Sequence, residues 1–313
     1  MKLKRIMLVL SIILIFMGCF MRMNKNFDSL SRYPYESEKD RQLIKKYLNT
    51  NEIEYIIEYS IAPVEFIRYI DKPGFNIYHT DKYKYISDVF WYLDDTNVVS
   101  FTEDLIRLDK IDEAVNLSLE YYYNEIIFFL KNGDVYNKSA VLIDNPNSIY
   151  AYLDENHTVS IRNPYPLVRV DFIDTNDADI YIRDVVYEPL KKMYETMISD
   201  LSKRYTDNLY ISNGYISYDM LVELYDNDKS WDMPGHSDHQ LGLAFDLALK
   251  SGDYETSKQF AWIKENAYKY GFIVNKNEGD MEKDSIFHLR YVGYDLALRA
   301  YENNLTLKEV LNK

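Results

Sequence analysis

The sequence predicts an α+β protein in which a mostly helical N-terminal region precedes a domain of mixed strands and helices. Apolar residues recur at helical spacing through the first half of the chain. Near the C-terminus, residues 242–249 and 287–292 alternate in character as half-buried strands do. Two prolines within residues 163–166 are typical of an extended connector, so we expect the boundary between the two regions at residues 160–161.

Composition indicates a globular chain and limits its partners. The 313 residues are 47% hydrophobic and 27% charged, which is enough apolar sequence for one large core or two modest ones. The formal net charge of −14 argues against nucleic acid, or an anionic membrane surface, as the main partner. The 31 tyrosines either follow the composition of the genome, since Ile, Asn and Lys are also abundant, or include a surface that faces carbohydrate.

Residues 1–18 have the pattern of a bacterial export signal. Three basic residues among the first five precede an apolar run at residues 6–17, which is too short for a membrane span of roughly 20 residues. Cys19 follows Gly18 as at a lipoprotein cleavage site, so we expect Cys19 to carry a lipid. The protein would then be extracytoplasmic and anchored to the outer face of the bacterial cytoplasmic membrane. An uncleaved N-terminal anchor is the alternative.

Residues 37–160 are expected to form the helical N-terminal region, after a polar tether at residues 20–36. Ser37 resembles the first residue of a capping box and so marks the start of a helix. Pro63 suits the first turn of another helix, because its missing N–H would be unpaired there. Further helices are expected over residues 104–117 and 121–130.

Residues 161–313 are expected to form the second domain. A long amphipathic helix is predicted over residues 180–205, and another over residues 257–270, where Gly271 ends it. Strands are predicted at residues 209–212, 242–249, 272–274 and 287–292. In the second of these strands the large apolar residues share one face, so Asp246 lies on the opposite face among small residues.

His239, Asp246 and His288 are a candidate set of metal ligands. Two imidazoles and one carboxylate suit zinc, and three protein ligands leave a fourth position open for water or substrate. A closed structural site normally has four ligands, often with cysteine, whereas the single cysteine of this chain, Cys19, is distant in sequence. The alternative is a hydrogen-bonded structural pair of histidine and aspartate without a metal.

The ligands lie within longer sequence blocks that identify a family. Residues 234–246 read PGHSDHQLGLAFD, and two later blocks read WIKENAYKYGF at residues 262–272 and HLRYVG at residues 288–293. In content and order these blocks resemble the VanY-type D-alanyl-D-alanine carboxypeptidases of the hedgehog/DD-peptidase group of metallopeptidases. The resemblance is strong from about residue 200 onward and weaker upstream.

The resemblance implies a zinc peptidase domain that removes the last D-alanine from peptidoglycan stem peptides. It makes His239, Asp246 and His288 the zinc ligands, and it makes Arg290 a buttress of the site. Ser237 and Gly242 would shape the loop that carries the first ligand. In the family, zinc polarises the peptide carbonyl and lowers the pKa of a bound water. A glutamate three residues before the last histidine takes the proton of that water.

The sequence departs from the family at two charged positions. Ser285 stands where the family has the catalytic glutamate, and Ile216 stands where it has a substrate-binding arginine. Losing a positioned general base typically costs ~10²–10⁴-fold in rate. Glu282 or Asp284 are candidate substitutes for the base. Other substrate-facing positions also differ, and cationic groups that could replace the arginine are Lys276 and Arg290.

Two functions therefore remain open from the sequence. The first is a zinc-dependent D-alanyl-D-alanine carboxypeptidase with an atypical base. The second is a catalytically inactive pseudoenzyme, a cell-wall-binding or scaffold lipoprotein that recognises stem peptides or a cell-wall enzyme. A third possibility keeps the fold but loses the metal. The histidines outside the candidate site are expected at the surface or in satisfied hydrogen bonds: His79, His157 and His236.

Overall fold

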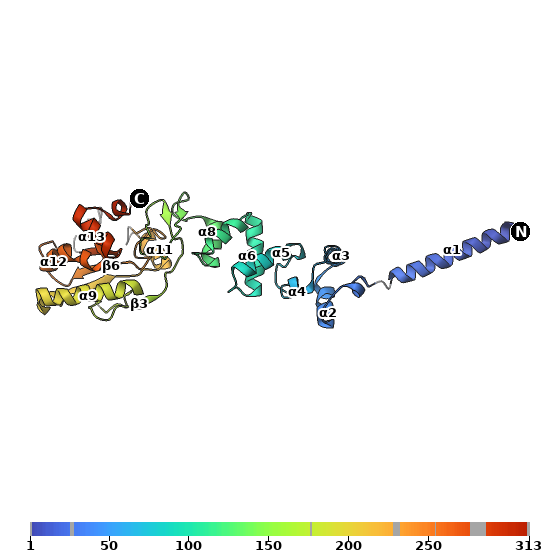
Figure 1. Cartoon of the computed structure of the whole chain (residues 1–313), viewed down its shortest axis with the longest axis horizontal. Coiled ribbons are helices and arrows are strands. Elements are labelled where there is room, and N and C mark those ends of the chain that lie inside the picture. The colour runs from blue at the N-terminus through green and yellow to red at the C-terminus, as the bar shows by residue number, and fades with distance from the viewer. Residues whose placement is uncertain are drawn as a thin grey trace. The chain divides into compact units, whose positions relative to one another are not determined.

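The computed structural model describes residues 2–25, 28–175, 177–227, 232–253, 255–275 and 286–311 (Figure 1). The chain forms two compact units, Met1–Ile111 and Asp112–Lys313. The first is helical and the second mixes helices with a sheet, which confirms the predicted α+β class with a helical N-terminal region.

The division between the units differs from the predicted boundary at residues 160–161. Residues 112–160 belong to the second unit because buried polar contacts hold them there. Arg162 forms a buried ion pair with Glu125 at 2.9 Å, and the Thr158 hydroxyl donates to the Gly235 carbonyl at 3.0 Å. Sequence patterning locates helices in this segment but carries no signal for such long-range partners.

The first unit has a small helical core. The Ser37 side chain accepts from the Asp40 N–H at the start of α2, as predicted, and Pro63 opens α4. The core is formed by side chains that include Ile44, Ile56 and Phe66, all fully buried. The elements of this unit are α1 (Lys2–Lys25), η1 (Ser29–Arg32), α2 (Glu38–Tyr47), α3 (Thr50–Glu58), α4 (Pro63–Phe66), η2 (Ile77–His79), α5 (Thr80–Val89) and α6 (Asp95–Leu108).

The predicted tether at residues 20–36 is wrong for its second half. Leu30 and Tyr33 are buried in the helical core, and Asp28 forms ion pairs with Arg41 and Lys45. Two apolar side chains are enough to fix this short polar run to the unit. Upstream, α1 carries an exposed Cys19. No helix in the described part of the chain combines the length and apolarity needed to cross a membrane.

The helix predicted over residues 104–117 is two helices. The first, α6, ends at Leu108, because the next residue, Asp109, has a φ of 58° in the left-handed region that terminates helices. The second, α7 (Ile111–Leu117), follows directly and precedes α8 (Tyr123–Asn132). The apolar periodicity continues across the break, so the sequence pattern alone does not show it.

The second unit is built on a four-stranded antiparallel sheet in the order β5-β6-β8-β7. Its strands are β5 (Leu209–Asn213), β6 (Ala244–Leu249), β7 (Phe272–Asn275) and β8 (Ile286–Tyr291). The predicted strands all appear, with ends shifted by one to two residues. Two small pairs lie outside the sheet: β1 (Val141–Leu142) with β2 (His157–Thr158), and β3 (Leu167–Arg169) with β4 (Tyr181–Arg183).

The helix predicted from residue 180 begins at Asp184, because the three residues before it pair with β3 as strand β4. This helix, α9 (Asp184–Leu201), buries Val186, Leu190, Met193 and Met197 in the core of the unit. The remaining helices are α10 (Lys203–Thr206), α11 (Tyr218–Asp226), α12 (Lys258–Asn266), η3 (Ala267–Tyr270), α13 (Tyr294–Asn303) and α14 (Leu307–Val310).

The register of the central strands positions the candidate site. Asp246 of β6 lies opposite His288 of β8, and Ala244 lies opposite Arg290. Because alternate residues of a strand share a face, these four residues lie on one face of the sheet. The opposite face carries Phe245, which is fully buried in the core.

Candidate metal centre

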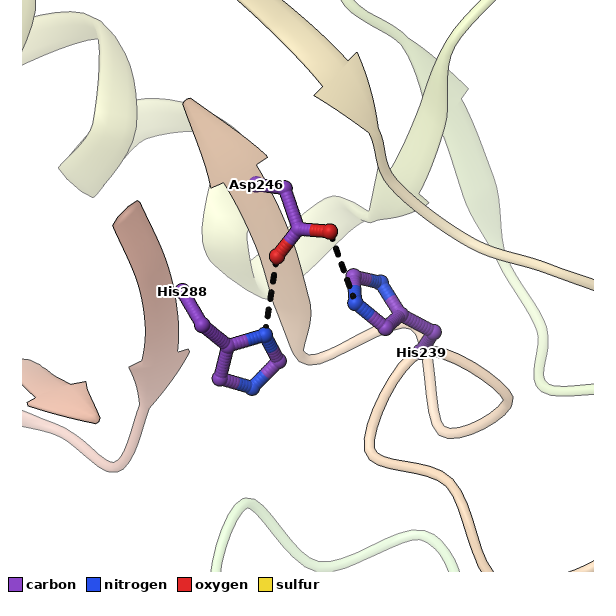
Figure 2. A group of neighbouring side chains, drawn as sticks. All are labelled: His239, Asp246 and His288. Atoms are coloured by element: carbon purple, nitrogen blue, oxygen red, sulfur yellow. Dashed lines mark hydrogen bonds and ion pairs between the residues drawn. The ribbon is translucent and has the colours of Figure 1, made fainter. Parts of the chain in front are cut away.

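The three predicted ligands meet in the second unit and form what we call the metal cluster: His239, Asp246 and His288 (Figure 2). His239 lies on the loop before β6, Asp246 lies on β6, and His288 lies on the neighbouring strand β8. One ligand atom from each residue lies within 4.8 Å of the others. All three are buried, with exposed fractions of 3%, 3% and 8%. Among the described residues, no other group of three such ligands is this close.

The hydrogen bonds of His239 define which nitrogen faces the cluster. Its Nδ1 donates to the Gly214 carbonyl at 2.7 Å, because a carbonyl oxygen can only accept. Its Nε2 lies 3.4 Å from Oδ2 of Asp246. In the neutral ring this nitrogen bears a lone pair, so a lone pair faces a carboxylate. A cation between them, either a proton or a metal ion, relieves the repulsion.

The electrostatics of the metal-free cluster agree with this geometry. Burial disfavours a charged His239, but the Asp246 carboxylate outweighs burial and raises the pKa of His239 to about 9. Burial likewise opposes ionisation of Asp246, yet the two imidazoles hold the pKa of its carboxyl well below its usual range. In the metal-free cluster the ionised Asp246 carboxylate is therefore balanced by a proton on His239, and a metal ion that binds there must displace that proton.

Asp246 is fixed from two further directions. Its Oδ1 lies 2.9 Å from Nδ1 of His288, and Figure 2 shows the carboxylate between the two rings. Its Oδ2 also accepts from the side-chain amide of Asn213 at 2.9 Å. Asn213 is not among the site residues predicted from the sequence. Asn213 lies at the end of β5, which pairs with the strand that carries Asp246, and this position is the signal that could have indicated a contact with the ligand.

The loop of His239 has the local structure expected of Ser237 and Gly242. The Ser237 hydroxyl accepts from the His239 N–H at 3.1 Å and donates to Asp232 at 3.0 Å. Gly242 has a φ of +64°, and a Cβ there would lie 2.9 Å from the Arg183 side chain. Only glycine fits this turn without displacing its neighbour.

Arg290 is fully buried and makes internal contacts. It donates to the carbonyls of Ile149 at 3.3 Å and Ala151 at 2.6 Å, and to that of Tyr291. Its Nε lies 3.1 Å from a carboxylate oxygen of Asp238, the residue before His239. Arg290 thus joins β8, the ligand loop and residues 149–151. With no exposed surface, it is excluded as a replacement for the substrate-binding arginine.

The predicted substitutes for the catalytic base, Glu282 and Asp284, lie outside the described residues. So do Ser285, at the place of the family's glutamate, and Lys276, a candidate cation for the substrate. Ile216, at the place of the family's arginine, is described. Its N–H donates to the His239 carbonyl at 3.3 Å, which places an uncharged side chain beside the ligand loop.

The remaining histidines are satisfied by other partners, as expected. His79 pairs with Glu103 at 2.8 Å, and His157 pairs with Asp154 at 2.7 Å. The imidazole of His236 is only 4% exposed, with Nδ1 2.6 Å from the Asp154 carbonyl and Nε2 3.2 Å from Asp134.

Comparisons with known proteins agree with the sequence motifs. Residues 185–294 match the sequence model of VanY, D-alanyl-D-alanine carboxypeptidase. YodJ of Bacillus subtilis (strain 168), a proposed carboxypeptidase, is 33% identical over 195 residues, covering 55% of this chain and 70% of that protein. A D-alanyl-D-alanine carboxypeptidase of Enterococcus faecalis (strain ATCC 700802 / V583) is 29% identical over 197 residues, covering 58% of this chain and 69% of that protein.

Solved structures also align with the second half of the chain. The LdcB LD-carboxypeptidase is 30% identical with a TM-score of 0.48, over 56% of this chain and 90% of that one. The family assignment rests on the sequence relatives, of which YodJ is matched over more than two thirds of its length. This chain therefore belongs to the VanY family of D-alanyl-D-alanine carboxypeptidases.

Proposed function

We propose that this chain holds one zinc ion and acts on peptidoglycan stem peptides that end in D-Ala-D-Ala. The observation that carries the proposal is the convergence of two imidazole nitrogens on the two oxygens of one buried carboxylate, at 2.9 Å and 3.4 Å. Family membership supplies the substrate class. The donor set of two nitrogens and one carboxylate is the one that catalytic zinc sites use.

The protein's own groups orient the ligands for this role. The Gly214 carbonyl fixes the ring of His239 so that Nε2 is the nitrogen left for the metal. Asn213 holds the Asp246 carboxylate, and Arg290 ties the strand of His288 to the ligand loop. Zinc in this site would polarise the scissile carbonyl and lower the pKa of a water molecule.

Hydrolysis also needs a group that accepts the proton of the attacking water. The neutral Ser285 hydroxyl cannot accept that proton near neutral pH, so in an active enzyme Glu282 or Asp284 takes this role. The charge of the substrate's terminal carboxylate must then be met without an arginine at position 216. We expect turnover at least ~10²-fold below that of a family member with the glutamate.

The second candidate function is recognition without hydrolysis, as a cell-wall-binding or scaffold lipoprotein. One contrast favours it. The metal cluster keeps all three family ligands and their supporting contacts, whereas the family's catalytic glutamate and substrate-binding arginine are replaced by Ser285 and Ile216. Loss of the base and the cationic group together would remove catalysis while leaving the metal ligands in place. A cell-wall enzyme is then a further partner that the domain would bind.

We also propose that the protein acts outside the cytoplasmic membrane, anchored by a lipid on Cys19. The basic and apolar pattern of residues 1–18, followed by Gly18 and Cys19, supports this proposal. Metabolic labelling with a radioactive fatty acid tests it. Label should enter the wild-type chain and be absent from a Cys19→Ser variant, and equal labelling of both would contradict it.

The experiment that separates the two functions measures D-alanine release by the zinc-loaded full chain from a pentapeptide ending in D-Ala-D-Ala. Wild type is compared with His239→Ala and with Ser285→Glu. Release by wild type that His239→Ala abolishes means a working enzyme, and Glu282→Gln and Asp284→Asn then locate its base.

No release by wild type with zinc still bound supports the binding function instead. A gain of turnover in Ser285→Glu, expected at ~10²-fold or more over wild type, means that the site lacks only its base. If Ser285→Glu and wild type are both silent and neither binds the pentapeptide, a stem-peptide function is ruled out.

A further inference from the structure

A second pocket lies in the same unit as the metal cluster and is used by none of the chemistry described above. Its volume is about 650 Å³. One part of its wall is the segment 141–152, which begins with β1, and the rest comes from His157 and the C-terminal helices α13 and α14. Figure 1 shows the C-terminal end of the chain beside the green segment that contains β1.

The wall of this pocket is joined to the metal cluster through Arg290. The carbonyls of Ile149 and Ala151, which belong to the pocket segment, both accept from its guanidinium. Arg290 follows His288 by two residues on β8, so their backbones are separated by roughly 7 Å. The two side chains also share a face of the sheet. The pocket segment therefore covers the same face that presents the metal ligands.

The pocket lining is mixed: aliphatic side chains from residues 141–143, α13 and α14 lie beside hydrogen-bonding groups and aromatic rings. Asp144, Asn145 and Ser148 contribute a carboxylate, an amide and a hydroxyl. Asp144 and Asn145 are exposed, and no hydrogen bond to the Asn145 side-chain amide comes from the described residues. The ring of Tyr150 is 48% exposed, and Arg299 lines the pocket from α13.

We propose that this pocket binds a saccharide, namely the amino-sugar segment of peptidoglycan near a stem peptide. A sugar presents hydroxyl and amide groups that both donate and accept, which the carboxylate, amide and guanidinium of the lining match. It also presents C–H faces that pack on an exposed aromatic ring such as that of Tyr150. Asp144 and Arg299 carry opposite charges, so the lining favours a neutral ligand over an ion.

This inference rests on the proposed function, because it assigns the pocket to another part of the same polymer. A stem peptide is covalently attached to an amino sugar, so a peptide bound at the metal cluster brings its glycan near the same face of the domain. The lining combines aliphatic side chains with polar side chains of both charges, so it suits a ligand with both C–H faces and polar groups better than a simple anion.

The test is an isothermal calorimetric titration of the full chain with a tetramer of N-acetylglucosamine. Wild type should bind the sugar. Tyr150→Ala should weaken binding about tenfold or more through loss of the ring, and Asn145→Ala about two- to tenfold through loss of hydrogen bonds. The matched control is Tyr122→Ala, since Tyr122 is similarly exposed, at 55%, but lies outside the pocket.

Absence of binding by folded wild type would overturn the inference, and so would binding that both pocket variants leave unchanged. Circular dichroism checks that each variant is folded, and if Tyr150→Ala is not, Asn145→Ala alone decides. The probe has no peptide and no D-alanine. Failure of sugar binding is therefore measured separately from failure of zinc binding or of D-alanine release.

Discussion

Two histidines on one loop, three residues apart, have different surroundings in this domain. His236 and Asp134 form what we call the structural pair. Both nitrogens of His236 face acceptors, and Asp134 also accepts from the Thr158 hydroxyl and from two backbone N–H groups. In the metal cluster, by contrast, two imidazoles converge on one carboxylate.

The difference shows that neighbouring residues, more than residue type, decide whether a histidine is held in a structural pair or lies among candidate metal ligands. In the structural pair each ring nitrogen of His236 faces an acceptor, so the imidazole uses both of its N–H groups within the fold. The metal cluster brings one atom from each of three potential ligands to within 4.8 Å of the others, around a buried, ionised carboxylate. The two clusters therefore respond differently to substitution, to zinc and to pH.

The largest expected effect separates the two carboxylates. Asp246→Asn removes an anionic ligand and should weaken zinc binding by more than about 100-fold, which exceeds the cost of losing a residue that only supports a ligand. Asp134→Asn is the matched control, since it alters a buried histidine-paired carboxylate without touching the cluster. Competition with a chromophoric chelator measures both affinities. Similar losses in the two variants would contradict the distinction.

A smaller effect is expected from Asn213, which contacts the cluster without being a ligand. Asn213→Ala removes the 2.9 Å hydrogen bond to Asp246 and should weaken zinc binding about 10- to 100-fold. Ser212→Ala is the control, because the Ser212 hydroxyl lies 3.5 Å from the backbone carbonyl of Asp246 and not from its carboxylate. Unchanged affinity in Asn213→Ala would show that Asp246 is oriented by its histidines alone.

The smallest effect belongs to the structural pair and depends on pH. Burial opposes the charge on His236, but Asp134 outweighs it and raises the pKa of His236. Burial also opposes ionisation of Asp134, while His236 lowers the pKa of that carboxyl. The stabilisation from His236 is full below its unfolded pKa of 6.5 and is lost as pH rises through the raised folded value. That from Asp134 is present above 3.8 and is lost at lower pH.

The pair should therefore stabilise the domain most between these two values. The free energy of unfolding lost in His236→Gln, measured with chelator present, should be larger at about pH 5 than at about pH 9. Zinc affinity should not change. A loss that is equal at both pH values would mean that His236 is neutral in the folded protein.

Much of the second unit could be predicted from the sequence because its signals are local. The alternation in β6 and β8 gave the face on which Asp246 and His288 lie, and the spacing of the family motif gave His239. The division of the chain after Ile111 could not be predicted in this way, because it depends on buried pairs such as Arg162 with Glu125. Asn213 was missed for the same reason, since its partner is 33 residues away in sequence.

The structural pair shows a further limit of sequence patterns. His236 was expected to be at the surface or satisfied, and its partner Asp134 is 102 residues away. Only the fold shows that the side chain of this histidine is buried and that it lies on the same loop as His239. The base that would replace Ser285 is a question for experiment, because Glu282 and Asp284 lie outside the described residues.

The most direct test of the central claim is a zinc titration of the metal-free full chain. Wild type is compared with the double variant His239→Ala and His288→Ala, and bound zinc is counted after gel filtration. The account predicts one zinc per wild-type chain and none in the double variant. Wild type that retains no zinc, or a double variant that retains as much as wild type, would contradict it.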